Sequence, residues 1–87
     1  MAKVHIPAAM RVLTGGVEEV SATGNTLGAV IDSLQGAHPG LKSRLVEEGR
    51  LRAGLAVFVD GVQVTGGLSA RIGEQSEIYF APAISGG

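Results

Sequence analysis

The spacing of apolar residues along the chain predicts one main helix. Four apolar residues recur at the spacing i, i+3, i+4 and i+7: Leu27, Val30, Ile31 and Leu34. Because this spacing places them on a single helix face, we predict a helix over residues 26–37. Asn25 or Thr26 can cap its first turn. Gly36 and Pro39 mark its end.

Two further features concern the helical region. Gly28 lies inside the predicted helix, where glycine costs about 1 kcal/mol relative to alanine. We therefore expect the helix to pack closely against the sheet at this position.

A second, shorter helical turn is predicted by Leu41, Leu45 and Val46, and Gly49 is expected to close it.

The residues before the main helix predict an N-terminal hairpin. Apolar and polar residues alternate through residues 3–6, which is typical of a strand. Residues 10–13 follow, and residues 14–16 (Thr-Gly-Gly) signal a turn. Residues 17–21 can then return as the second strand.

A second hairpin is predicted in the latter half of the chain. After a connector at residues 50–54, the β-branched and aromatic residues 55–59 form a strand. The Asp60-Gly61 pair is the strongest short hairpin signal in the sequence. We expect residues 62–64 to be the return strand.

The last strand completes an α+β arrangement. Residues 77–81 are predicted to form it, and Pro82 cannot continue its hydrogen-bond ladder. The order β-β-α-β-β-β predicts a mixed sheet packed on one main helix. If the first and last strands are adjacent, they run parallel. We therefore expect a domain over residues 1–81 and an extended tail over residues 82–87.

Composition narrows the class of protein. The 87 residues carry 7 Lys and Arg against 8 Asp and Glu, a balance that argues against nucleic-acid binding. The absence of cysteine excludes disulfides, thiolate zinc sites, iron–sulfur clusters and a cysteine nucleophile. No apolar run approaches the ~20 residues of a membrane span, and the start does not resemble a signal peptide. We therefore expect a cytoplasmic protein without a membrane partner.

The sequence contains no recognisable catalytic or metal-binding pattern. His5 and His38 are far apart, and neither belongs to a carboxylate or cysteine cluster with metal-site spacing. We expect His5 on a strand face and His38 at a helix end. No catalytic residue and no metal ligand is predicted, so the protein is not expected to be an enzyme.

The C-terminal residues are the candidate reactive site. Extended, the tail reaches at most about 20 Å from the sheet. Glycine has no Cβ. Gly86 and Gly87, after Ser85, could therefore pass through a narrow channel and bring a carboxylate to a reactive phosphate. Frayed ends of small residues are also common. The dipeptide alone therefore leaves a functional end and a frayed end both open.

A candidate partner surface lies on the last strands. Strand alternation places Ile78 and Phe80 on one face, and Tyr79 and Ala81 on the other. Which set faces the helix is not fixed by the pattern, because a one-residue shift exchanges the faces. The aromatic residues could thus fill the core instead. The candidate interface is Phe58, Val62, Tyr79, Ala81, Pro82 and Ile84.

The strand order and the diglycine end resemble the ubiquitin-like β-grasp fold. Residues 77–87, a hydrophobic strand followed by Pro, small residues and Gly-Gly, resemble the ThiS/MoaD family of sulfur-carrier proteins. The likeness covers nearly the whole chain and is nearest to the CysO-type carriers of cysteine biosynthesis. The pieces that carry this finer likeness are residues 6–7, Arg11, and residues 14–16, 26–31 and 66–68. Ser85 departs from the pattern, in which alanine is common, and little consequence is expected.

This resemblance implies a specific chemistry at Gly87. An E1-like (MoeB/ThiF-type) enzyme would adenylate its carboxylate with ATP, and sulfur would displace AMP to leave a thiocarboxylate. In the cysteine-forming relatives the thiocarboxylate attacks an activated serine derivative on a pyridoxal-phosphate enzyme. A zinc-dependent (JAMM-type) peptidase then releases the product. ATP, zinc and pyridoxal phosphate would thus belong to partner enzymes, and the carrier itself would bind no cofactor.

Three other roles remain open at this point. The chain could be the small subunit of a molybdopterin synthase, bound to its large subunit and donating sulfur to a pterin precursor. It could be a ubiquitin-like modifier that becomes attached to protein lysines. It could also be a binding module that acts only through its surface.

Overall fold

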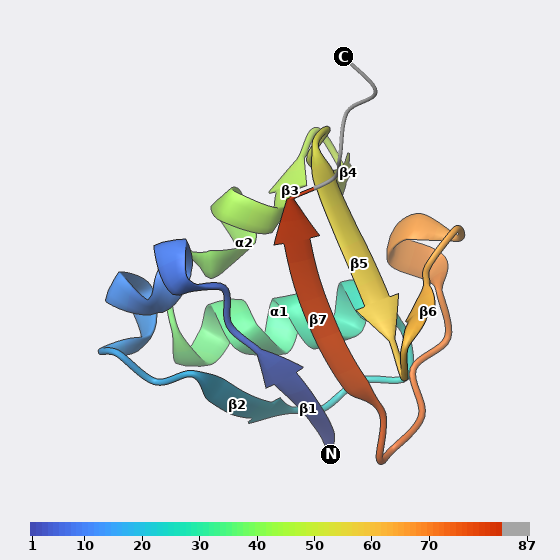
Figure 1. The fold of residues 1–87 in the computed structure, drawn as a ribbon, viewed down its shortest axis with the longest axis horizontal. Helices are drawn as coiled ribbons and strands as arrows, with labels where there is room; N and C mark the ends of the chain where they lie inside the picture. The colour runs from blue at the N-terminus through green and yellow to red at the C-terminus, as the bar shows by residue number, and fades with distance from the viewer. Residues whose placement is uncertain (83–87) are drawn as a thin grey trace.

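The computed structural model describes residues 1–82 and contains a five-stranded mixed sheet (Figure 1). Its strands, in the spatial order β2-β1-β7-β5-β6, are β1 (Ala2–His5), β2 (Glu19–Ala22), β5 (Leu55–Val59), β6 (Val62–Gln63) and β7 (Glu77–Pro82). β1 and β7 pair in parallel, and the other neighbours are antiparallel. The predicted mixed sheet, with its first and last strands adjacent, is therefore confirmed.

Helix α1 (Leu27–Ala37) lies across one face of the sheet, as predicted (Figure 1). Thr26 caps it, because the Thr26 hydroxyl oxygen accepts a hydrogen bond from the Ala29 N–H at 3.2 Å. The short helix α2 (Leu41–Leu45) follows and packs against α1. No helix within residues 1–82 is long and apolar enough to cross a membrane.

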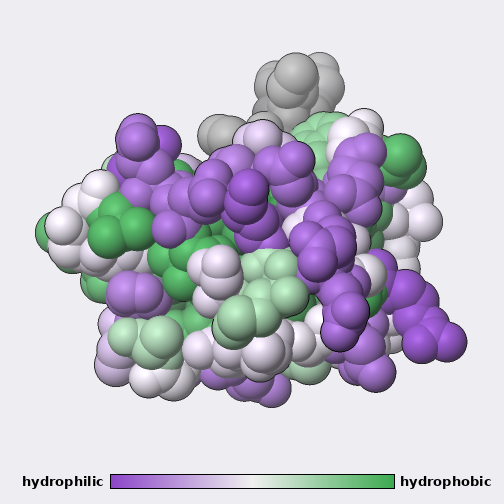
Figure 2. Space-filling model, turned by 90° about the horizontal axis from the view of Figure 1, so that it is seen from below, coloured by the Kyte–Doolittle hydropathy of each residue, from purple (hydrophilic) through white to green (hydrophobic). Residues whose placement is uncertain are grey.

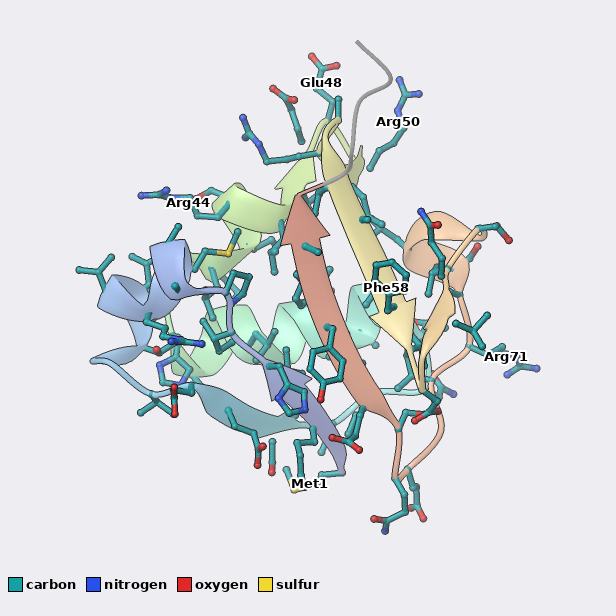
Figure 3. The ribbon with its side chains drawn as sticks, viewed as in Figure 1. Met1, Arg44, Glu48, Arg50, Phe58 and Arg71 are labelled. Atoms are coloured by element: carbon teal, nitrogen blue, oxygen red, sulfur yellow. The ribbon has the colours of Figure 1, made fainter. Side chains whose placement is uncertain are left out.

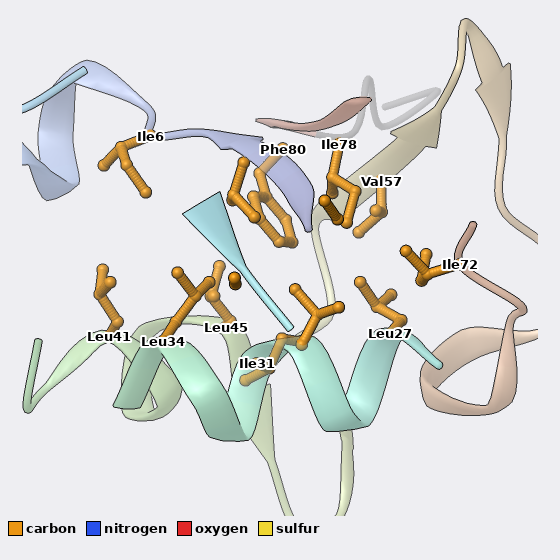
Figure 4. Close-up of a cluster of buried hydrophobic side chains, with 14 residues drawn as sticks. Ile6, Leu27, Ile31, Leu34, Leu41, Leu45, Val57, Ile72, Ile78 and Phe80 are labelled. Atoms are coloured by element: carbon orange, nitrogen blue, oxygen red, sulfur yellow. The ribbon is translucent and has the colours of Figure 1, made fainter. Parts of the chain in front are cut away.

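The hydrophobic core lies between α1 and the sheet (Figure 4). Each large aliphatic side chain buried there contributes about 1.5–3 kcal/mol relative to exposure. The central members include Val4, Leu27, Ile31, Leu34, Val57 and Ile78. By contrast, the molecular face drawn in Figure 2 mixes hydrophilic and hydrophobic residues, as folded domains commonly do.

The N-terminal hairpin forms, but its connection differs from the prediction. Residues 10–13 belong to a 3-10 helix, η1 (Ala8–Thr14), rather than to a hairpin strand. Met10 and Leu13 both pack against the core. Their spacing of three residues matches the 3-10 repeat, which brings them to the same side. Gly15, at φ 67°, ends the helix.

The predicted connector at 50–54 also contains regular structure. β3 (Val46–Glu47) pairs with β4 (Arg50–Leu51) in a separate two-stranded hairpin. Glu48 (φ 52°) and Gly49 (φ 75°) form its turn with positive φ at both positions. This is the same turn chemistry that the Asp-Gly pair of the β5–β6 hairpin uses. Gly49 therefore closes a hairpin and not the preceding helix.

The close packing expected at Gly28 is present, but its partner is a short 3-10 helix rather than the sheet. A Cβ at Gly28 would lie 3.3 Å from the carbonyl oxygen of Leu68. Leu68 belongs to the short 3-10 helix η2 (Gly67–Ser69) and packs against the core. Gly28 thus allows η2, rather than the sheet, to approach α1 closely.

Candidate functional site

The sheet face that points away from α1 carries the aromatic residues of the candidate interface. On β7, Ile78 (0% exposed) and Phe80 (7%) are buried toward the helix, whereas Tyr79 is 45% exposed. Phe58 is half-buried and lies directly opposite Tyr79 across β5 and β7. Residues opposite one another across a strand pair share a face. Phe58 and Tyr79 therefore belong to the outer face, which answers the question that strand alternation left open.

His5 extends this aromatic surface onto β1. The parallel pairing of β1 with β7 sets His5 beside Tyr79. Their rings stack with centroids 3.9 Å apart and planes inclined by 3°. We call His5, Tyr79 and Phe58 the aromatic row, which crosses the outer face of β1, β7 and β5; Phe58 is labelled in Figure 3.

Carboxylates surround the β1 end of the aromatic row. The Nε2 atom of His5 lies 3.0 Å from Oε1 of Glu77, and its Nδ1 atom lies 3.8 Å from Oε1 of Glu19. Lys3 approaches the other Glu19 oxygen at 3.9 Å. The carboxylates and Lys3 are about half exposed and His5 is partly buried, so water screens these pairs and each adds little stability. Their effect is to orient the His5 ring and to give the row a polar margin.

An open groove of about 420 Å³ lies beside this margin. Its lining includes Tyr79 and His5 of the aromatic row together with Arg11 and Glu18. The Arg11 guanidinium donates to the Ile6 carbonyl oxygen at 3.0 Å and lies 3.4 Å from Glu18. The groove therefore has internally paired charges.

The remaining predicted interface residues divide between the two faces. Ala81 follows the outward alternation of β7 and lies opposite Ala56 near the end of the sheet. Val62 is 69% exposed but lies opposite Val59, which packs against the core. By the same register rule, Val62 faces the helix side. It does not join the patch with Phe58 and Tyr79, which corrects the sequence-based grouping.

The predicted reactive end lies outside the residues that the structure describes. The Pro82 backbone lies in β7 opposite Leu55, one residue beyond the predicted strand end. Ile84, Ser85, Gly86 and Gly87 lie outside the described residues. The structure thus places the end of the strand from which these residues continue.

The two histidines occupy the expected kinds of position. His38 ends α1, with its backbone N–H donating to the Leu34 carbonyl oxygen at 2.7 Å, and His5 lies on a strand face. Among residues 1–82 no group of three His, Asp or Glu side chains could hold a metal ion. The contact between His5 and Glu77, 72 residues apart, was missed because it requires the β1–β7 pairing register.

The sequence and the fold both match known sulfur-carrier proteins. The sulfur carrier protein CysO of Mycobacterium tuberculosis and that of Mycobacterium bovis are each 37% identical to this chain. Each match covers 97% of this chain and 96% of the relative.

Solved structures of a CysO complex and of an archaeal modifier protein have the same fold as this chain. A chain in the crystal structure of the Amycolatopsis orientalis BexX/CysO complex has a TM-score of 0.92 and 36% identity, with both chains fully covered. The small archaeal modifier protein 1 of Methanosarcina acetivorans has a TM-score of 0.79 and 26% identity, with 99% of this chain and 95% of that chain covered. The β-grasp fold expected from the sequence is thereby confirmed. Because the ThiS family model also matches residues 4–87, the chain belongs to the ThiS family.

Proposed function

We propose that this protein is a sulfur carrier of cysteine biosynthesis, and that Gly87 bears the sulfur as a thiocarboxylate. The observation that carries the proposal is the 37% identity, over 97% of this chain, to the sulfur carrier CysO. The Gly86-Gly87 end supplies the chemical group that such a role needs. A carboxyl group after two glycines has no nearby side chain to block its entry into an enzyme channel.

Activation must come first, because a free carboxylate is a poor acyl donor. The Gly87 carboxylate attacks the α-phosphate of ATP and releases pyrophosphate, which leaves an acyl adenylate. A sulfide-level sulfur donor then attacks the acyl carbon, and AMP leaves with the bonding electron pair. The product is a thiocarboxylate, a nucleophile that needs no cysteine in this chain.

The reactions before and after loading belong to partner proteins. We assign adenylation to an E1-like enzyme of the MoeB/ThiF type. We assign sulfur acceptance to a pyridoxal-phosphate cysteine synthase, and product release to a zinc-dependent peptidase. ATP, pyridoxal phosphate and zinc would therefore be bound by those enzymes, and this chain would act as their substrate.

The outer sheet face is the proposed docking surface for these partners. Tyr79 and Phe58 form an exposed and half-exposed aromatic pair on rigid central strands. Aromatic residues are enriched at interfaces because they bury a large area with little loss of conformational entropy. Ala81 continues this face on β7, and Pro82 and Ile84, which follow it in the sequence before Gly87, complete the proposed surface.

Intact-mass spectrometry tests the proposal. Incubation with ATP, sulfide and an E1-like enzyme should add about 16 Da, the difference between sulfur and oxygen in the thiocarboxylate. Deletion of Gly87 should abolish the gain and leave the unfolding curve unchanged. Ser85→Ala is the matched control in the tail and should load as the wild type does. Equal loading of the Gly87 deletion would overturn the assignment.

The likeness to the archaeal modifier protein supports a second candidate, attachment to protein lysines. It would use the same adenylate, with a lysine amine as the nucleophile in place of sulfur. Immunoblots of cells that express a tagged chain would then show high-mass adducts that depend on Gly87. A loaded carrier without such adducts favours the sulfur-carrier function alone.

A further inference from the structure

A second groove lies beside the end of β7, the point from which residues 83–87 continue. We call it the exit groove. Its volume is about 270 Å³. It is formed by the connection into η1, by α2, by the turn before β5, and by the ends of β5 and β7. The apolar residues that line it, which we call its floor, are Pro7, Met10, Leu55 and Ala81. The two cationic side chains that line it are Arg44 and Arg52.

The two arginines give the exit groove a positive rim. Arg44, labelled in Figure 3, is exposed on α2 and lines the exit groove. Arg52 is held in place, because its Nη1 donates to the Ser43 carbonyl oxygen at 3.2 Å and its backbone N–H donates to Leu45 at 2.9 Å. Within residues 1–82 no carboxylate lies within 4.0 Å of either guanidinium.

The nearest acidic residues along the chain do not neutralise this rim. Glu47 and Glu48 lie in the β3–β4 hairpin and do not line the exit groove. Figure 3 shows Glu48 at the tip of that hairpin, near Arg50. The exit groove thus combines a small apolar cavity with an excess of positive charge. The exit groove adjoins β7, the strand that precedes the proposed reactive end in the sequence.

We propose that the exit groove binds an acidic segment of the partner protein that receives the tail. An aliphatic side chain of that segment fills the floor, and carboxylates on either side of it pair with Arg44 and Arg52. Placing that side chain against the floor removes apolar surface of both proteins from water. Arginine forms bidentate pairs with carboxylates and is enriched at interfaces.

The position of the exit groove explains why a partner would use it. A partner that takes in residues 83–87 must approach the end of β7, so its surface comes to rest on the exit groove. This step rests on the proposed function. Opposite charges on the two proteins would speed their encounter and fix the orientation in which the tail enters. The exit groove lies around the end of the sheet, separate from the aromatic row on its outer face.

The direct test uses a peptide and needs no enzyme. The probe is the acetylated and amidated pentapeptide Asp-Glu-Leu-Glu-Asp, titrated into ¹⁵N-labelled protein and followed by NMR. We expect saturable shifts of the Ala53, Gly54 and Ala81 amides, and an affinity that falls as NaCl is added. Arg44→Glu should weaken binding about tenfold. Arg71→Glu is the control of equal charge change at a distant exposed site and should bind as the wild type does.

Several results would overturn this proposal. The first is the absence of a saturable NMR shift at roughly millimolar acidic peptide. The second is that the pentapeptide Lys-Lys-Leu-Lys-Lys binds as tightly as the acidic one. The third is that Arg71→Glu weakens binding as much as Arg44→Glu does. A chain lacking residues 83–87 gives a further check. If only that shortened chain binds the peptide, the tail itself occupies the exit groove and the partner assignment is wrong. The peptide assay does not involve loading of Gly87. A failure of the exit-groove proposal would therefore appear in the NMR titration, and a failure of the sulfur-carrier function would appear in the intact-mass assay.

Discussion

Substitutions at two adjacent residues of β7 should separate folding from partner binding. Ile78 is fully buried against α1, so Ile78→Ala leaves a cavity and should cost about 2–5 kcal/mol. Tyr79→Thr replaces one residue that favours strands with another and loses mainly the stack on His5. An aromatic pair contributes about 0.5–1.5 kcal/mol. The Tyr79 variant should therefore remain folded, whereas Ile78→Ala removes a large part of the roughly 5–15 kcal/mol typical of a domain.

The same pair should respond in the opposite order in an activation assay. If Tyr79 anchors the partner, its loss costs about 2 kcal/mol of binding, which lowers kcat/KM for ATP-dependent loading about thirtyfold. Urea unfolding and loading kinetics on the same samples give the two free energies. Ile78→Val, at about 0.5–1.5 kcal/mol, is the folded control and should load normally. Equal destabilisation by Tyr79→Thr and Ile78→Ala would refute the assigned facing, and unchanged loading of Tyr79→Thr would refute the docking surface.

Three further predictions concern α1 and are each measured as the free energy of unfolding in urea. Thr26→Ala removes the cap hydrogen bond and should cost about 0.5–2 kcal/mol, whereas Thr26→Ser should retain most of it; equal losses would exclude the cap. Gly36→Ala meets no atom within 4 Å and should gain up to about 1 kcal/mol from helix propensity. Gly28→Ala should fail to show this gain, because its Cβ would crowd the Leu68 carbonyl oxygen; a gain equal to that of Gly36→Ala would show that η2 does not pack there.

The elements that local chemistry specifies were predicted from the sequence. The main helix, strand β5 and the Asp60-Gly61 turn all form where the pattern placed them. In each case the signal lies within a few residues, as an apolar repeat, a β-branched run or a residue that tolerates positive φ. The 3-10 helix η1 and the β3–β4 hairpin were not predicted. Both are short, and only packing against the core distinguishes them from loops.

The composition of the candidate site was thus determined by the sequence, and its arrangement only by the tertiary structure. The diglycine end, the absence of cysteine and the aromatic residues of the last strands are properties of the sequence itself. Pairing of β1 and β5 with β7 decided that Phe58 and Tyr79 face outward and that His5 joins them, and pairing of β6 with β5 decided that Val62 does not. Strand alternation permits two opposite facings, and only register across distant strands, fixed by burial against α1, selects one.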